Sequence, residues 1–164
     1  MFVKSRFIAV LVIAAIFITL TGCAGVAVSN PVSTVDSQTV AAQLQFVDGV
    51  KVGPLYNMSV TVPDTWVNQF KVRNVGNSLY FDYVTPAGTS APIFFIEALS
   101  SSQFWEQNGS LPGSYRSIVN RGDTYFIYHL PLDAYYSGLS KEEYTALAET
   151  VPSVISTFTA QTAN

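Results

Sequence analysis

The sequence predicts an α+β domain with a mainly antiparallel sheet of about five to seven strands, packed by a C-terminal amphipathic helix. Three observations predict this class. Short segments of alternating apolar and polar residues recur between about residues 44 and 130, and turn residues such as Gly, Asn and Asp separate them. From about residue 140, apolar residues recur at helical spacing. Strands that come first and a helix that comes last are typical of this class.

A segment with the layout of an export signal precedes the domain. Lys4 and Arg6 are followed by the run Phe7–Leu20, which is apolar except for Thr19, and the segment ends in Leu20-Thr21-Gly22-Cys23. A positive, an apolar and a small-residue region in this order are typical of a secretory signal. The last four residues resemble the lipobox of bacterial lipoproteins. The resemblance covers residues 1–23 only.

The lipobox resemblance implies an anchored, outward-facing protein. Residues 1–22 would be removed as a signal peptide, and Cys23 would carry acyl chains such as palmitate. The protein would then be attached to the cell membrane on its extracytoplasmic side. An uncleaved signal anchor remains the alternative, although the 14-residue apolar run is shorter than the roughly 20 residues that a membrane span prefers.

The segment 23–43 separates the anchor from the domain. It is rich in small and hydroxylated residues and carries a single charge at Asp36. We interpret it as a lipidated tether, in which about 20 flexible residues reach near 25 Å. A single α+β domain is then expected over residues 44–164.

The first expected strands come in hairpins. Asp48-Gly49 lies between apolar pairs within 44–52 and predicts a two-residue hairpin loop. Residues 56–62 alternate between apolar and polar with a period of two, which predicts a strand with one buried face. Pro63 ends that strand because it cannot donate to a ladder, and Trp66 follows where it can cap the core.

The middle of the chain predicts the centre of the sheet. Strands at about 69–75 and 78–84 flank Gly76-Asn77. The continuous apolar run 93–98 suits a strand buried on both faces. A short helix of one or two turns is expected over 100–108.

The last expected elements are a hairpin and a helix. Residues 115–119 and 124–130 form the hairpin around the turn 120–123. Ser140 and Glu143 predict a capping box at the start of the helix. One apolar stripe then continues past Pro152, which predicts a kink rather than two helices. The stripe consists of Tyr144, Leu147, Ala148, Val151, Val154, Ile155 and Phe158.

The order of these elements carries a second resemblance. A strand ending in Val62-Pro63-Asp64-Thr65-Trp66, several hairpins, an apolar central strand and a C-terminal helix are similar to PsbP-like domains, some of which occur in small secreted bacterial lipoproteins. The match is architectural, with a Pro-x-x-Trp corner. It implies an accessory or scaffolding role and supplies no catalytic residues.

Composition excludes several classes of function. The net charge is −3, and without Lys4 and Arg6 the acidic excess is larger. A nucleic-acid binder needs clustered positive charge, so no nucleic-acid partner is expected. Cys23 is the only cysteine and His129 the only histidine, which excludes intramolecular disulfides, multi-thiolate zinc sites and sites with two or three histidines. We therefore expect no metal and no cofactor.

Few residues suggest catalysis, and no common catalytic or nucleotide-binding motif occurs. The alternative function is a small glycosidase-like envelope hydrolase that uses Glu97 and Asp82, with Glu106 as another possible partner for Glu97. His129 with Asp133 and a serine would be needed for a triad. We interpret His129 instead as a hydrogen-bonded packing residue.

Glu97 and the motif Arg121-Gly122-Asp123 also have structural interpretations. Glu97 is expected to face solvent or to pair with Arg73 or Arg116. Arg121-Gly122-Asp123 matches a tripeptide that animal integrins bind. The same residues are also common in turns at the tip of a hairpin, where glycine can adopt a positive φ.

Aromatic residues supply the remaining functional signal. Aromatic side chains that cannot all point inward are common at contact surfaces. The candidate binding surface comprises Trp105, Tyr128, Tyr135 and Tyr136. The sequence therefore predicts a non-catalytic binding or accessory module of the cell envelope, whose partner is an envelope protein or a glycan.

Overall fold

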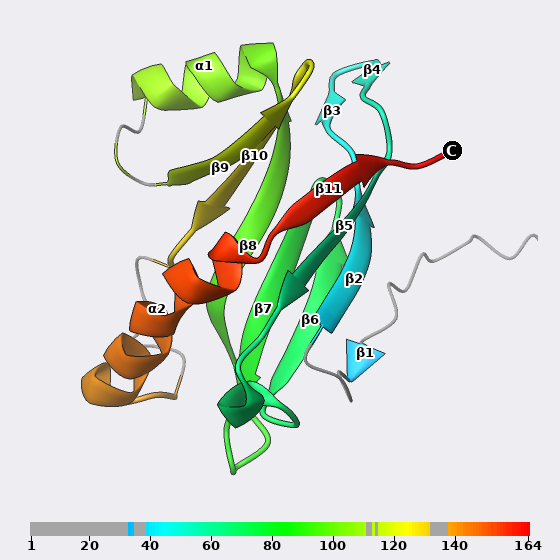
Figure 1. The fold of residues 1–164 in the computed structure, drawn as a ribbon. Coiled ribbons are helices and arrows are strands. Elements are labelled where there is room, and N and C mark those ends of the chain that lie inside the picture. Colours follow the sequence, from blue (N-terminus) through cyan, green and yellow to red (C-terminus); the bar gives the residue numbers. More distant parts are fainter. Residues whose placement is uncertain (1–32, 35–38, 111–112, 114, 132–137) are drawn as a thin grey trace, which may run out of the picture.

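The computed structural model of the protein describes residues 33–34, 39–110, 113, 115–131 and 138–164 (Figure 1). The expected signal peptide 1–22, the lipidation site Cys23 and most of the expected tether lie outside these residues. Tyr135 and Tyr136 also lie outside them.

Strands dominate the described part of the chain, and two helices and a 3-10 turn complete it. The strands are β1 (Ser33–Thr34), β2 (Thr39–Leu44), β3 (Val47–Asp48), β4 (Lys51–Val52), β5 (Tyr56–Thr61), β6 (Phe70–Val75), β7 (Ser78–Val84), β8 (Ser90–Ser100), β9 (Arg116–Arg121), β10 (Thr124–His129) and β11 (Thr159–Thr162). The helices are α1 (Ser101–Ser110) and α2 (Lys141–Ser156), and the 3-10 turn is η1 (Asp64–Trp66).

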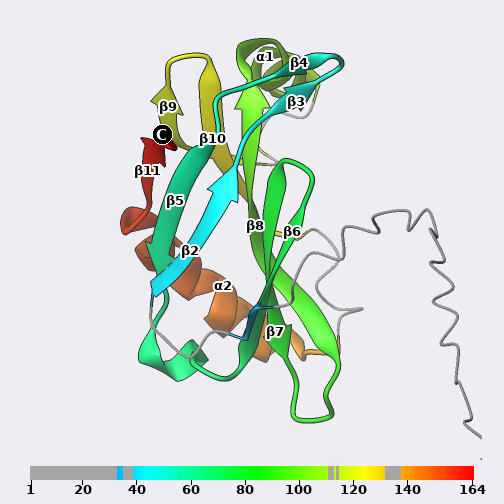
Figure 2. The same ribbon diagram turned by 90° about the vertical axis from the view of Figure 1, so that its right-hand side faces the viewer.

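The strands form two packed sheets and a small hairpin. The large sheet has the order β1-β6-β7-β8-β10-β9, the second has the order β11-β5-β2, and β3 pairs with β4. Every pair is antiparallel. The second sheet and α2 lie on the same side of the large sheet (Figure 2). We call this side of the large sheet its inner face and the opposite side its outer face. The α+β class is confirmed.

The core lies between the two sheets because alternate residues of each strand point into it. On β8, which is central as predicted, Phe94, Ile96 and Ala98 are fully buried in this core. The Phe94 ring stacks on Phe81 of β7 at 4.3 Å between centroids. Trp66 is 3% exposed and closes one end of the core. The prediction for Trp66 is therefore confirmed.

The hairpin turns follow the predicted positions with small shifts. The β6–β7 turn is Gly76-Asn77 as predicted, and the β9–β10 turn is reduced to Gly122-Asp123. Gly76 and Gly122 have φ of 60° and 62°. A glycine at the first position with positive φ is typical of the type II′ turn, whose twist matches that of the flanking strands.

Two segments were predicted wrongly. The domain begins before residue 44, because Thr39–Leu44 form β2, in which Val40 and Leu44 are buried. Alanines at the intervening positions make this alternation weak in the sequence. The chain also does not end with the helix: after Thr157 it forms β11, which pairs with β5. The strands were further expected in one sheet, whereas β2, β5 and β11 form a second one.

The helix α2 confirms the predicted capping box. The Ser140 hydroxyl accepts from the Glu143 amide at 3.2 Å, and the Glu143 carboxylate accepts from the Ser140 amide at 2.9 Å. The helix runs through Pro152 without a break. Val151 and Val154 of the predicted stripe are buried in the core, and Leu147 and Ile155 pack against it.

Replacing Ser140 by alanine should lower the free energy of unfolding by about 1 kcal/mol at neutral pH, because the cap loses its acceptor. Backbone and hydroxyl hydrogen bonds from Ser140 lower the pKa of Glu143 from its ordinary 4.5. The stability that this carboxylate contributes is therefore complete above that pKa and is lost as the pH falls through the lowered folded value. Urea titrations at several pH values measure both effects. Thr145→Ala, on an exposed turn of α2, is the control and should not show the loss.

Candidate binding face

The outer face of the large sheet is partly covered by α1. Phe104 of α1 stacks on Tyr125 of β10 at 4.3 Å between centroids. Under this end of the sheet Ile127 and Leu99 are buried. Away from α1, this face carries half-buried side chains of β6, β7 and β8, among them Arg73, Tyr80 and Phe95.

A row of stacked side chains crosses the outer face from strand to strand. Arg73, Tyr80, Phe95 and His129 occupy paired positions on β6, β7, β8 and β10. The Arg73 guanidinium lies 4.8 Å from the centroid of the Tyr80 ring. The Tyr80 and Phe95 centroids are 4.8 Å apart, and those of Phe95 and His129 are 4.4 Å apart. These spacings match the roughly 4.7–4.9 Å between strands, so the rings stand upright and turn their edges outward.

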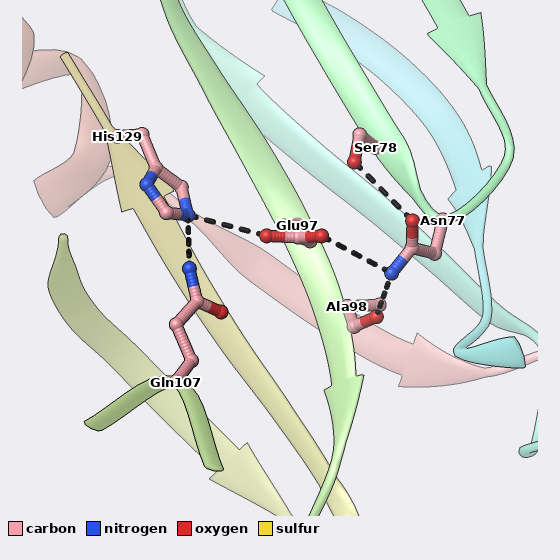
Figure 3. A network of polar contacts seen from close by, with 6 residues as sticks. All are labelled: Asn77, Ser78, Glu97, Ala98, Gln107 and His129. Atoms are coloured by element: carbon pink, nitrogen blue, oxygen red, sulfur yellow. Dashed lines mark hydrogen bonds and ion pairs between the residues drawn. The ribbon is translucent and has the colours of Figure 1, made fainter. Parts of the chain in front are cut away.

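A polar network centred on Glu97 lies beside this row (Figure 3). One carboxylate oxygen, Oε2, is 3.2 Å from His129 Nε2, and the other, Oε1, accepts from Asn77 Nδ2 at 3.3 Å. Asn77 Nδ2 also donates to the Ala98 carbonyl at 2.9 Å. The same ring nitrogen of His129, Nε2, is also 3.4 Å from Gln107 Nε2 of α1. Hydrogen bonds thus join β8, β10 and the β6–β7 turn, and α1 approaches them through Gln107.

Whether Nε2 of His129 carries a proton decides which hydrogen bond it can form. A single ring nitrogen cannot accept from Gln107 and donate to Glu97 at the same time. The contact with Glu97 therefore requires the proton on Nε2. His129 is 9% exposed and stacked on Phe95, as expected for the hydrogen-bonded packing residue that the sequence predicts.

The network does not place a serine against His129. Ser78 pairs with Glu97 across the β7–β8 ladder, and its hydroxyl donates to Asn77 Oδ1 at 3.3 Å. In Figure 3 Ser78 and Asn77 lie on one side of Glu97 and His129 on the other. A serine nucleophile must hydrogen-bond to its histidine, so Ser78 is not arranged as one. Asp133 lies outside the described residues.

Asp82 is held by an ion pair of its own. Arg73 donates to it through both Nε and Nη2, the latter at 3.2 Å from Oδ1. The Asp82 side chain is 4% exposed and that of Arg73 is 42% exposed. The hydrogen bond to Asp82 raises the pKa of Arg73, and burial opposes this shift in part. With Lys71, this pair lines a shallow pocket of ≈ 370 Å³ on the outer face.

The structure does not bring Glu97 and Asp82 together. Glu97 pairs with Ser78, and Asp82 lies four residues further along β7, which corresponds to about 13 Å of strand. Glycosidase carboxylates lie roughly 5–9 Å apart. The predicted pairing of Glu97 with Arg73 or Arg116 is also wrong, because Asn77 and His129 take that place.

The four aromatic residues of the predicted binding surface do not form one patch. Tyr128 pairs with Ile96 and so shares its inner face, where it packs against the core. Trp105 is 59% exposed on α1, which covers the outer face. Tyr135 and Tyr136 lie outside the described residues.

The Arg121-Gly122-Asp123 tripeptide is built into the fold as a turn. The Arg121 carbonyl accepts from the Tyr56 hydroxyl at 2.9 Å. Asp123 forms an ion pair with Lys51 of β4, and the hydrogen bond from Lys51 lowers the pKa of Asp123. The tip thereby connects the β9–β10 hairpin to the β3–β4 hairpin.

Sequence reasoning missed Gln107 and treated Asn77 only as a turn residue. No local pattern identifies them, because both reach Glu97 or His129 from separate elements. The described residues contain no cluster of three or more His, Cys, Asp or Glu side chains that would hold a metal ion. No helix in the described ranges has the length and apolar character needed to cross a membrane.

No protein-family model, no curated protein and no solved structure matches this chain. The similarity to PsbP-like domains therefore stays a prediction from the order of the elements.

Proposed function

We propose that this protein is a lipid-anchored, outward-facing module of the cell envelope that binds or supports a partner. The observation that carries the proposal is the sequence Leu20-Thr21-Gly22-Cys23 after a positively charged and apolar segment. Cys23 is also the only cysteine of the chain. An acylated Cys23 would leave the domain tethered at the membrane surface.

The outer face supports binding over hydrolysis. Both carboxylates of the alternative hydrolase, Glu97 and Asp82, already hold structural partners and lie on separate parts of the face. The half-buried rings of Tyr80 and Phe95 lie beside Arg73 and Asp82. Such a mixture of aromatic and charged groups is common at contact surfaces.

The orientation of the rings favours a protein over a glycan as partner. Sugars pack on exposed ring faces, whereas the stacked rings of Tyr80, Phe95 and His129 turn their edges outward. An accessory role next to an envelope protein also agrees with what the resemblance to PsbP-like domains implies.

Crosslinking in intact cells tests the proposed binding face. A photoreactive phenylalanine at Trp105, which is 59% exposed at the border of the outer face, should give a discrete crosslinked product, identified by mass spectrometry. The same group at Thr145, on an exposed part of α2, is the control and should not give that product. Identical products from both positions would contradict a binding face beside α1.

A further inference from the structure

The edge strand β9 borders a groove on the inner side of the molecule. The groove has a volume of ≈ 490 Å³ and separates β9 from the C-terminal half of α2. Its apolar walls include Ile118, Ile155 and Phe158, which are each only partly buried. This position gives the groove an apolar wall and a strand edge along the same side.

The backbone of β9 is open on that side. β9 is the last strand of the large sheet, and in the described part of the chain it pairs only with β10. One row of its amide and carbonyl groups therefore points away from the sheet. Such an edge is a template on which an extended chain can add a strand.

Two arginines mark the ends of this edge. Arg116 and Arg121 pair with Tyr128 and Thr124 of β10, so both lie on the inner side of β9 and line the groove. Among the described residues, neither forms an ion pair with a carboxylate. Arg116 donates to the carbonyls of Gly113 and Tyr115 instead. In a chain with excess acidic residues, these two cations suit an acidic ligand.

We propose that β9 binds an extended acidic segment of a partner protein as an additional strand. Its carboxylates would pair with Arg116 and Arg121, and an apolar side chain between them would enter the groove. This inference goes beyond the proposed function, since it depends on neither the lipid anchor nor the outer face.

The β-bulge of β9 sets the spacing of the ligand. Arg121 and Arg116 pair with Thr124 and Tyr128, which are four residues apart on the regular strand β10. The register shift in β9 accounts for its one extra residue. A regular partner strand would also need four steps, or about 13 Å. The ligand motif is therefore Glu-x-apolar-x-Glu, because residues two apart share a face.

A second copy of this chain suits the edge less well. A symmetric antiparallel pair of β9 strands would place Arg116 of one copy opposite Arg121 of the other, and like charges at facing positions are destabilising. Charges and bulges also protect sheet edges from pairing. The partly exposed apolar groove beside β9 distinguishes a binding edge from one that is only protected.

A labelled peptide tests the charges. The full chain, purified in detergent, should bind fluorescent Thr-Glu-Thr-Val-Thr-Glu-Thr, measured by anisotropy. Arg121→Gln, and separately a peptide with Gln in place of both Glu residues, should each weaken binding about tenfold. Lys141→Gln removes an exposed charge from α2 and should leave binding unchanged. Equal binding of the Glu and Gln peptides, or no binding to the unmodified protein, would overturn the proposal.

Backbone methylation of the same peptide tests strand addition. Alternate amides of a strand point to opposite edges. One peptide is N-methylated at its Glu and Val residues and a second peptide at its Thr residues. One of these two peptides should no longer bind, and the other should bind as the unmethylated peptide does. Equal effects of the two patterns would refute strand addition to β9. A dimer of the protein that competes with the peptide would show that a second copy, and not an acidic segment, occupies this edge. The crosslinking result at Trp105 does not depend on these peptide experiments. The proposed binding face beside α1 and the proposed strand addition to β9 can therefore fail independently.

Discussion

Cys23→Ala should move the protein from the membrane fraction to the soluble or unprocessed fraction and abolish its labelling by palmitate. Each buried methylene of an acyl chain contributes about 0.8 kcal/mol to membrane binding, so one chain binds marginally and several bind stably. If the thiol of Cys23 is the only attachment point, its removal eliminates the whole contribution. We therefore expect an effect that is close to all or none.

The control for this substitution is Ser29→Ala, in the same segment of the chain. It leaves the residues of the lipobox unchanged, so labelling and fractionation should match those of the unmodified protein. If Cys23→Ala also leaves both unchanged, the N-terminal segment is an uncleaved anchor and the lipobox assignment is wrong.

Phe94→Ala should lower the free energy of unfolding by about 3–5 kcal/mol, the range for phenylalanines deleted from a core. Phe94 is fully buried at the centre of the large sheet. It stacks on Phe81 at 4.3 Å and lies 6.2 Å from the Trp66 ring between centroids. Domains are typically stable by about 5–15 kcal/mol. The variant should therefore be close to unfolding, which chemical denaturation measures.

The neighbouring Phe95 is the matched control because it points to the other face of the same strand. It is only half-buried and stacks on Tyr80 and His129. Phe95→Ala should therefore cost less, about 1–2 kcal/mol from the stacking and partial burial. If the two variants lose equal stability, the assignment of an inner and an outer face is incorrect.

Local patterns predicted most of the fold, and the failures have a common cause. Residues that are close in the sequence are enough to recognise the alternation of β5, the turns at Gly76 and Gly122 and the capping box of Ser140. The strand β2 was not predicted because some of its alternating positions are alanine. The strand β11 was not predicted because only one of its four side chains, Ala160, is buried. Both strands are defined mainly by pairing with β5, which is not a local property.

The candidate binding face was less predictable than the fold. The sequence placed His129, Tyr125 and Ile127 on one face of a strand correctly. The partners of Glu97 depended on how three strands align, and Gln107 reaches His129 from a helix. Register between distant segments is set by the whole core, so single-strand periodicity could not identify this network.

Intact-mass spectrometry of the protein extracted from membranes tests the lipid anchor most directly. The proposal predicts a chain that begins at Cys23 and carries the added mass of acyl groups on that residue. A chain that retains residues 1–22 and carries no acyl mass would contradict it.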